Sequence, residues 1–159
     1  MSRPLVEVIH GPNLNLLELR DPTIYGGLRF GALERRIAAW ADELGLRANL
    51  LQTNDAGRFV GELQRIARAA RGLGLPRPAA LIVNPGALTH YAWSLHDALE
   101  LVGLPTVEVH LSEPASREAW RATSVVSNLC LATVAGKGPE GYRIALQLIA
   151  GRLAEGGKR

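Results

Sequence analysis

The sequence is poor in several features that mark particular classes of protein. It contains a single cysteine, Cys130, so no disulfide can form within the chain. It has no run of about 18 apolar residues, the length that a membrane-spanning helix needs. It also has no block of like charges, and its four histidines lack the spacing of zinc ligands. We therefore expect a protein that binds no membrane, no nucleic acid, no metal and no organic cofactor.

The overall composition is that of an ordinary globular protein. Of the 159 residues, 47% are hydrophobic and 21% are charged, and the formal net charge is +3. This length and this apolar content predict one domain spanning residues 1–159. The first residues show no basic-then-apolar signal pattern, and a lone cysteine suits a reducing compartment. We therefore expect a cytoplasmic protein.

Short apolar runs alternate with longer amphipathic ones, which is typical of an α/β protein with a parallel sheet. The run at 79–83 is apolar throughout, as expected for a central strand covered on both faces. Five such units predict a flavodoxin-like, doubly wound fold with a five-stranded parallel sheet of order 2-1-3-4-5. The predicted strands are 5–10, 47–52, 79–83, 106–110 and 129–134, and the predicted helices are 32–44, 59–70, 91–102, 116–122 and 141–153.

The segment after the first predicted strand, residues 11–30, has no periodicity and is expected to be a long loop. Structureless loops of this length are usually functional lids or disordered segments. Arg20 and Tyr25 lie close together in it, and a cation beside a tyrosine favours the phenolate, which can act as a general base. The alternative interpretation is a tyrosine–glycine turn next to a surface arginine.

The segment after the third predicted strand begins with Asn84. Thr89 is suited to cap the next helix, whose free N–H groups would attract a carboxylate. His90 would then lie in the first helical turn, with Asp97 roughly two turns further along the same face. The alternative interpretation is a capping turn followed by a surface helix.

Glu108 and His110 alternate along the fourth predicted strand, so they point to the same face. The carboxylate can orient the imidazole as a general acid. Ser112 opens the next loop, and Arg117 and Arg121 would share one face of a short helix, as an anion site or a salt-bridged surface. Doubly wound folds bind ligands beyond the carboxyl ends of their strands, so the three segments are expected to meet.

Four long motifs stand in order along the chain and together resemble the type II dehydroquinases. They are GPNLNLLxxRxPxxYG from residue 11, NPGAxTHYxxxLxDAL from 84, VEVHLSxxxxREAxR from 107 and GxGxxGYxxAL from 136. The glycine pattern of the last motif precedes the final helix, and no acidic residue follows at the distance of a dinucleotide site. We therefore interpret it as structural.

The resemblance implies a flavodoxin-like enzyme that dehydrates 3-dehydroquinate to 3-dehydroshikimate by anti elimination through an enolate. Tyr25, activated by Arg20, would take the proton beside the ketone, and Asn13 with a bound water would stabilise the enolate. His110, oriented by Glu108, would protonate the departing hydroxyl. Arg117 would set the electrostatics around the base.

The same resemblance implies how the substrate is held. Asn84 and the backbone N–H groups of Leu111 and Ser112 would meet its carboxylate. His90 and Arg121 would bind ring hydroxyls. Asp97 would reach a neighbouring subunit's site, because the family assembles as trimers stacked into a homododecamer.

The chain also departs from the family pattern. Glu18 stands where a glycine is common, and it could hold Arg20 away from Tyr25. The rival hypotheses are a paralogue that converts a related cyclic polyol acid, a binding protein without catalysis, and an electron carrier that holds a flavin. The lysines, Lys137 and Lys158, lie outside the three segments, which argues against the Schiff-base chemistry of type I dehydroquinases.

Overall fold

A computed structural model describes residues 2–74 and 76–156, in which five parallel strands form one sheet of order β2-β1-β3-β4-β5. This order confirms the predicted topology. Residues 1, 75 and 157–159 of the expected domain lie outside the described residues. The strands are β1 (Leu5–His10), β2 (Arg47–Gln52), β3 (Ala80–Asn84), β4 (Thr106–His110) and β5 (Ala132–Ala135).

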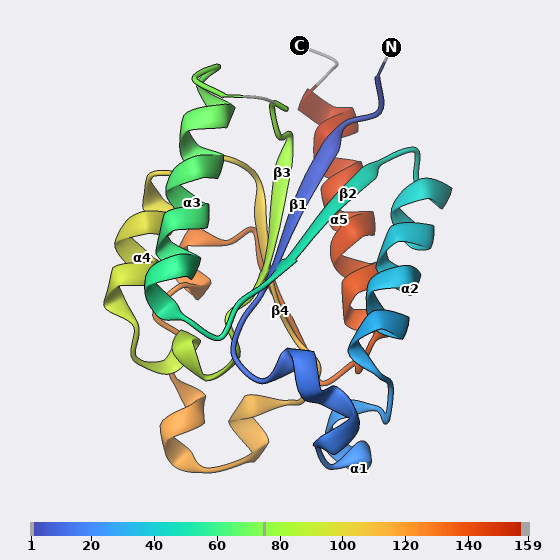
Figure 1. Ribbon diagram of the computed structural model, residues 1–159, viewed down its shortest axis with the longest axis vertical. Coiled ribbons are helices and arrows are strands. Elements are labelled where there is room, and N and C mark those ends of the chain that lie inside the picture. The colour runs from blue at the N-terminus through green and yellow to red at the C-terminus, as the bar shows by residue number, and fades with distance from the viewer. Residues whose placement is uncertain (1, 75, 157–159) are drawn as a thin grey trace.

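Helices cover both faces of the sheet (Figure 1). On one face α2 (Phe30–Glu43) and α5 (Glu140–Gly156) pack against side chains such as Val6, Ile82 and Val107. On the other face α3 (Ala56–Ala70) and α4 (Trp93–Glu100) pack against Ile9 and Leu81. Every residue of β1, β3 and β4 is buried as a result, which explains the nearly continuous apolar run of β3.

The carboxyl ends of the strands lie at the lower end of the sheet in Figure 1, where the chain is most irregular. The prediction of a structureless loop at 11–30 was wrong. That segment contains the 3-10 helix η1 (Leu14–Leu19) and the short helix α1 (Pro22–Tyr25). The side chain of Asp21 caps α1 by accepting the Thr23 N–H, and Leu14 and Leu17 are buried in the core.

The predicted helix at 91–102 was also displaced. A 3-10 helix, η2 (Gly86–His90), comes first, and α4 begins only at Trp93. Thr89 therefore does not cap α4, and His90 does not share a helical face with Asp97. Thr89 is instead 1% exposed and donates a hydrogen bond to Glu108.

The predicted helix at 116–122 is two separate 3-10 turns, η3 (Pro114–Ser116) and η4 (Ala119–Ala122). Arg117 and Glu118 lie between them with non-helical backbone angles. The last strand is shorter than predicted, because residues Ser127–Leu129 form another 3-10 turn, η5. Short irregular turns are hard to anticipate, since several residue types fit each position and no periodic pattern marks them.

Two glycines hold together the segments that leave β1 and β3. Gly11 donates its N–H to the Asn84 carbonyl, and a Cβ at Gly11 would lie 2.3 Å from the Pro85 carbonyl oxygen. Gly86 has φ of +59° and a Cβ there would lie 3.2 Å from the carbonyl oxygen of Pro12. Only glycine fits these positions without moving backbone. Among the described residues, no helix is long and apolar enough to cross a membrane.

Candidate active site

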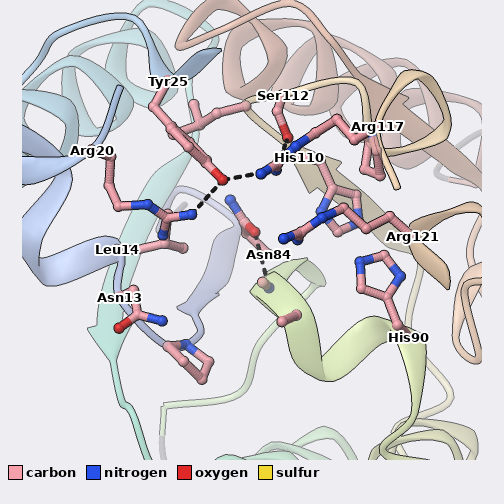
Figure 2. Close-up of a pocket in the computed structure, with 15 residues that line it drawn as sticks. Asn13, Leu14, Arg20, Tyr25, Asn84, His90, His110, Ser112, Arg117 and Arg121 are labelled. Atoms are coloured by element: carbon pink, nitrogen blue, oxygen red, sulfur yellow. Dashed lines mark hydrogen bonds between the residues drawn. The ribbon is translucent and has the colours of Figure 1, made fainter. Parts of the chain in front are cut away.

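A pocket opens beyond the carboxyl ends of β1, β3 and β4, with an empty volume of about 660 Å³ including its open mouth. It brings together the three segments that the sequence singled out. The predicted site residues that line it are Asn13, Arg20, Tyr25, Asn84, His90, His110, Leu111, Ser112, Arg117 and Arg121 (Figure 2). Within the described part of the chain this lining includes arginines and no Asp or Glu, so the pocket favours an anionic ligand.

Tyr25 lies between two arginines at one wall of the pocket, as Figure 2 shows. Its hydroxyl accepts hydrogen bonds from the guanidinium groups of Arg20 and Arg117, the second at 2.8 Å. The Arg20 guanidinium also lies 4.1 Å from the centre of the Tyr25 ring. Two cations at one phenolic oxygen stabilise negative charge on it. Since Arg20 reaches Tyr25, the hypothesis that Glu18 holds it away was wrong.

The opposite wall carries His110, whose Nε2 lies 2.7 Å from Glu108 Oε1. A carboxylate accepts, so Nε2 carries a proton and donates it, which leaves Nδ1 as the second ring position for chemistry. Val107 and Val109 face the α5 side of the sheet, so Glu108 and His110 face the other side together. This contact confirms the predicted pairing of the two side chains.

Glu108 is completely buried, and a set of hydroxyl groups surrounds its carboxylate. Thr89 donates at 2.5 Å, Ser124 at 3.0 Å and Thr133 at 3.1 Å. Burial alone raises the pKa of Glu108, but the bonds from His110, Thr89 and Ser124 outweigh it, and the pKa falls below its usual range. Glu108 is therefore a buried carboxylate that stays ionised beside His110.

Asn84 ends β3 at the floor of the pocket and is 2% exposed. Its Oδ1 accepts the Gly86 N–H at 3.2 Å, and its Nδ2 donates to the hydroxyl of Tyr142 at 2.9 Å. Neighbouring Leu111 is held by the glycine-rich motif, since the Gly138 N–H donates to its carbonyl. That bond fixes the peptide plane that also carries the N–H of Ser112.

The mouth of the pocket carries His90 and Arg121. His90 Nδ1 lies 2.6 Å from the Thr123 carbonyl, which can only accept, so Nδ1 is protonated and Nε2 is free to accept. Arg121 is held at 2.5 Å by Glu118, with its guanidinium 4.0 Å from the centre of the Trp120 ring. Both side chains thus have fixed orientations before any ligand arrives.

Asn13 completes the lining through an unusual backbone conformation. Its φ of 69° lies in the left-handed region, and among the described residues no other non-glycine residue has a positive φ. Its N–H donates to the side chain of Asn54 at 2.9 Å, and Gln52 in turn donates to Asn54 at 3.0 Å. Residues far away in sequence therefore hold the turn that presents the Asn13 amide.

Two predicted site residues lie outside the pocket. Glu108 sits behind His110, as its expected orienting role requires. Asp97 projects from α4 with its side chain 84% exposed, next to His96 and not among the pocket residues. Sequence reasoning gave Thr89 a different role and missed the other residues that hold the site, namely His10, Gln52, Asn54, Ser124, Thr133 and Tyr142. Among them, the end of β1 could have pointed to His10, because β1 ends at the same edge.

Comparison with known proteins gives one consistent result. A model of the family described as dehydroquinase class II matches residues 4–150. A 3-dehydroquinate dehydratase of Thermus thermophilus is 41% identical over 154 residues, covering 97% of this chain and 99% of that protein. One from Pelotomaculum thermopropionicum is 40% identical over 145 residues, covering 91% of this chain and 95% of that protein.

A solved structure agrees with these relatives. The type II dehydroquinase of Propionibacterium acnes has a TM-score of 0.85 and 36% sequence identity, covering 95% of this chain and 98% of that one. The similarity thus extends over nearly the whole chain in both sequence and fold. The chain belongs to the class II dehydroquinase family.

Proposed function

We propose that this protein dehydrates 3-dehydroquinate to 3-dehydroshikimate, in the shikimate pathway or in quinate breakdown. The observation that carries the proposal is the pairing of two chemical groups across one cationic pocket. Tyr25 with its arginines stands on one side, and His110 with Glu108 stands on the other. Elimination from a β-hydroxy ketone needs a base and an acid, and the family relatives bear the name of this reaction.

In the first step, the Tyr25 phenolate takes the proton from the carbon next to the ketone. The C–H electron pair moves toward the ketone oxygen and forms an enolate. Arg20 and Arg117 favour the phenolate that starts the step, because both donate hydrogen bonds to its oxygen. Asn13 lines the pocket with a side-chain amide that can donate to the enolate oxygen, together with a bound water.

In the second step, the enolate re-forms the ketone and expels the hydroxyl from the neighbouring carbon. His110 donates a proton to that hydroxyl, so water leaves and the carbon–carbon double bond forms. The ionised Glu108 stabilises the imidazolium form that must exist before the transfer. The cycle closes when Tyr25 releases its proton and His110 regains one from solvent, so no external oxidant or reductant is needed.

The substrate carboxylate would lie at the floor of the pocket. Asn84 Nδ2 has a second N–H beyond the one that it gives to Tyr142, and Ser112 offers its backbone N–H nearby. His90 and Arg121 would bind ring hydroxyls at the mouth, with the free Nε2 of His90 as an acceptor. This orientation sets the reacting carbons between Tyr25 and His110.

The test is the appearance of the conjugated enone. Purified protein mixed with 3-dehydroquinate should produce a growing ultraviolet absorbance, whereas quinate, which has no ketone, should produce none. Folded protein that gives no enone from 3-dehydroquinate, across a range of protein and substrate concentrations, would contradict the assignment. We further propose that the protein is located in the cytoplasm.

We also propose that the chain assembles as trimers stacked into a dodecamer, with Asp97 entering a neighbour's site. The exposed position of Asp97 on α4 supports this, since its side chain serves no contact in its own pocket. The aromatic side chains of Tyr91, just before α4, and Trp93, its first residue, are 63% and 64% exposed, as is typical of residues that a partner covers. Light scattering should give the mass of twelve chains, and a monomer with full activity would contradict the proposal.

A further inference from the structure

His10 and Tyr142 have no part in the steps above, and they form a buried hydrogen-bonded chain that ends at Asn84. Asn84 Nδ2 donates to the Tyr142 hydroxyl at 2.9 Å, and the same hydroxyl lies 2.9 Å from His10 Nδ1. The three residues come from β3, α5 and β1, and they are far apart in sequence. His10 and Tyr142 are both 0% exposed.

The direction of every hydrogen bond in this chain follows from one end. The Gly86 N–H can only donate, so the Asn84 atom that faces it must be the oxygen, and the nitrogen must face Tyr142. The Tyr142 oxygen therefore accepts from Asn84. The buried Tyr142 proton needs an acceptor, and among the described residues His10 Nδ1 is the one within hydrogen-bond distance, so we assign the proton to that bond and the His10 proton to Nε2.

Burial keeps both partners neutral, which the chain requires. Desolvation lowers the pKa of His10 to about 3. Desolvation also raises the pKa of Tyr142 well above its usual range, although the bond from Asn84 opposes this. These shifts favour the neutral form of both groups near neutral pH.

The arrangement leaves one buried polar atom without a partner in the described part of the chain, which points to a role other than stability. Among the described residues no hydrogen-bond partner reaches His10 Nε2, although the atom is buried. The Phe30 ring meets the His10 ring at a right angle, with centroids 5.0 Å apart, so the surroundings of the imidazole include apolar surface. A buried polar atom without a partner is unfavourable, and an apolar side chain would avoid this.

We propose that His10 and Tyr142 are positioning residues that hold the Asn84 amide with its nitrogen toward the pocket, so that its second N–H receives the substrate carboxylate. An Asn amide has nearly the same shape after a half-turn, and that turn would present an oxygen to the carboxylate. The Gly86 N–H opposes the turn through a bond of 3.2 Å to the amide oxygen, and the Tyr142 hydroxyl opposes it further because its proton is directed to His10. The inference rests on the proposed function for the carboxylate role of Asn84.

The test measures binding rather than turnover, so it stands apart from the test of the reaction. Calorimetry gives the dissociation constants of quinate and of its neutral methyl ester, neither of which has the ketone needed for elimination. The native protein should prefer the acid. Tyr142→Phe and His10→Leu should weaken quinate binding about tenfold and leave ester binding nearly unchanged, because one oriented donor to the carboxylate is lost.

Two further variants separate positioning from general damage. His10→Asn keeps an acceptor where Nδ1 stood and should bind quinate within about threefold of the native protein. Thr106→Val removes another buried hydroxyl, which donates to Leu104 away from the pocket, and should leave both dissociation constants unchanged. Circular dichroism and melting temperatures of all variants show which of them are folded.

A double variant gives the decisive comparison. If Tyr142 acts through Asn84, adding Tyr142→Phe to Asn84→Ala should weaken quinate binding no further. Full additivity in the double variant, or equal losses for acid and ester in the folded single variants, would overturn the inference. Native protein that does not prefer the acid would overturn it as well, whether or not that protein turns over 3-dehydroquinate.

Discussion

The molecule contains two tyrosine–histidine sets at the same edge of its sheet, and they have opposite chemical characters. Tyr25 and His110 face the pocket, and their partners are charged, namely two guanidinium groups and a carboxylate. Tyr142 and His10 are sealed behind the pocket, bonded to each other and to a neutral amide. The residue types are the same, so the partners and the access to solvent must determine what each set does.

The difference teaches how one fold obtains reactive and inert copies of the same groups. Opposite charge at hydrogen-bond distance stabilises the ionised form that acid–base chemistry needs. Burial with neutral partners disfavours the ionised form, as the lowered pKa of His10 illustrates. Such groups can still form hydrogen bonds that position their neighbours. The first set is therefore expected to move protons, and the second to hold other atoms in place.

The largest expected difference in kcat is between the two variants that remove a tyrosine hydroxyl, one from each set. Tyr25→Phe should lower kcat by about 10³-fold, within the range typical of general bases. Tyr142→Phe should lower kcat by no more than about tenfold, because Tyr142 contacts no reacting atom. Steady-state assays of both variants at saturating 3-dehydroquinate make the comparison. Similar losses of kcat in the two variants would remove the distinction between the sets.

On the acid side, Glu108→Gln should lower kcat by about 10²-fold. The amide keeps the volume of the carboxylate but cannot stabilise the imidazolium of His110 by charge. Thr133→Val, which removes one of the donors to Glu108, is the matched control and should lower kcat less than about tenfold. A Glu108→Gln enzyme with native kcat would show that the carboxylate is only structural.

Burial of His10 should make the free energy of unfolding depend on pH. The folded pKa of His10 is about 3, while the unfolded chain takes a proton near the ordinary value of 6.5. As pH falls through this window the unfolded state binds one more proton, so stability is lost, at up to about 1.4 kcal/mol per pH unit. Denaturant titrations of the native protein and His10→Asn should differ by this slope. Equal slopes would mean that His10 becomes protonated in the folded protein.

The smallest effect is expected at Glu18, which lies on the surface of the segment that carries Tyr25. Arg20 already bonds to Tyr25, so Glu18→Gly should change kcat and KM by less than about twofold. Glu118→Ala is the contrasting variant. It should raise KM more than Glu18→Gly does, because Glu118 holds the Arg121 guanidinium at 2.5 Å. A large gain in kcat from Glu18→Gly would show that this residue restrains Arg20 in solution.

Much of this arrangement could be predicted from the sequence because it depends on simple periodicities. Alternation along β4 places Glu108 and His110 on one face, and parallel strands bring their carboxyl ends to one edge. Thr89 was misplaced because the turn after Pro85 is a 3-10 helix, and nothing in the local pattern separates such a turn from the start of an α-helix.

The supporting residues could not be found in the same way. Tyr142 lies 132 positions from His10, and it stands in an amphipathic helix where an aromatic residue normally indicates core packing. Its contact with Asn84 depends on how α5 lies across the sheet, which no local pattern encodes. Local patterns do not reveal a role for Asp97 either, because its side chain is 84% exposed and does not line the pocket of its own chain.

The division of labour between Tyr25 and His110 is tested most directly by hydrogen exchange at the substrate. In deuterated water, a His110→Asn variant should exchange the proton beside the ketone while forming almost no enone, because the base and the enolate remain. Tyr25→Phe should show neither exchange nor enone. Exchange that disappears with His110, or persists without Tyr25, would contradict the account.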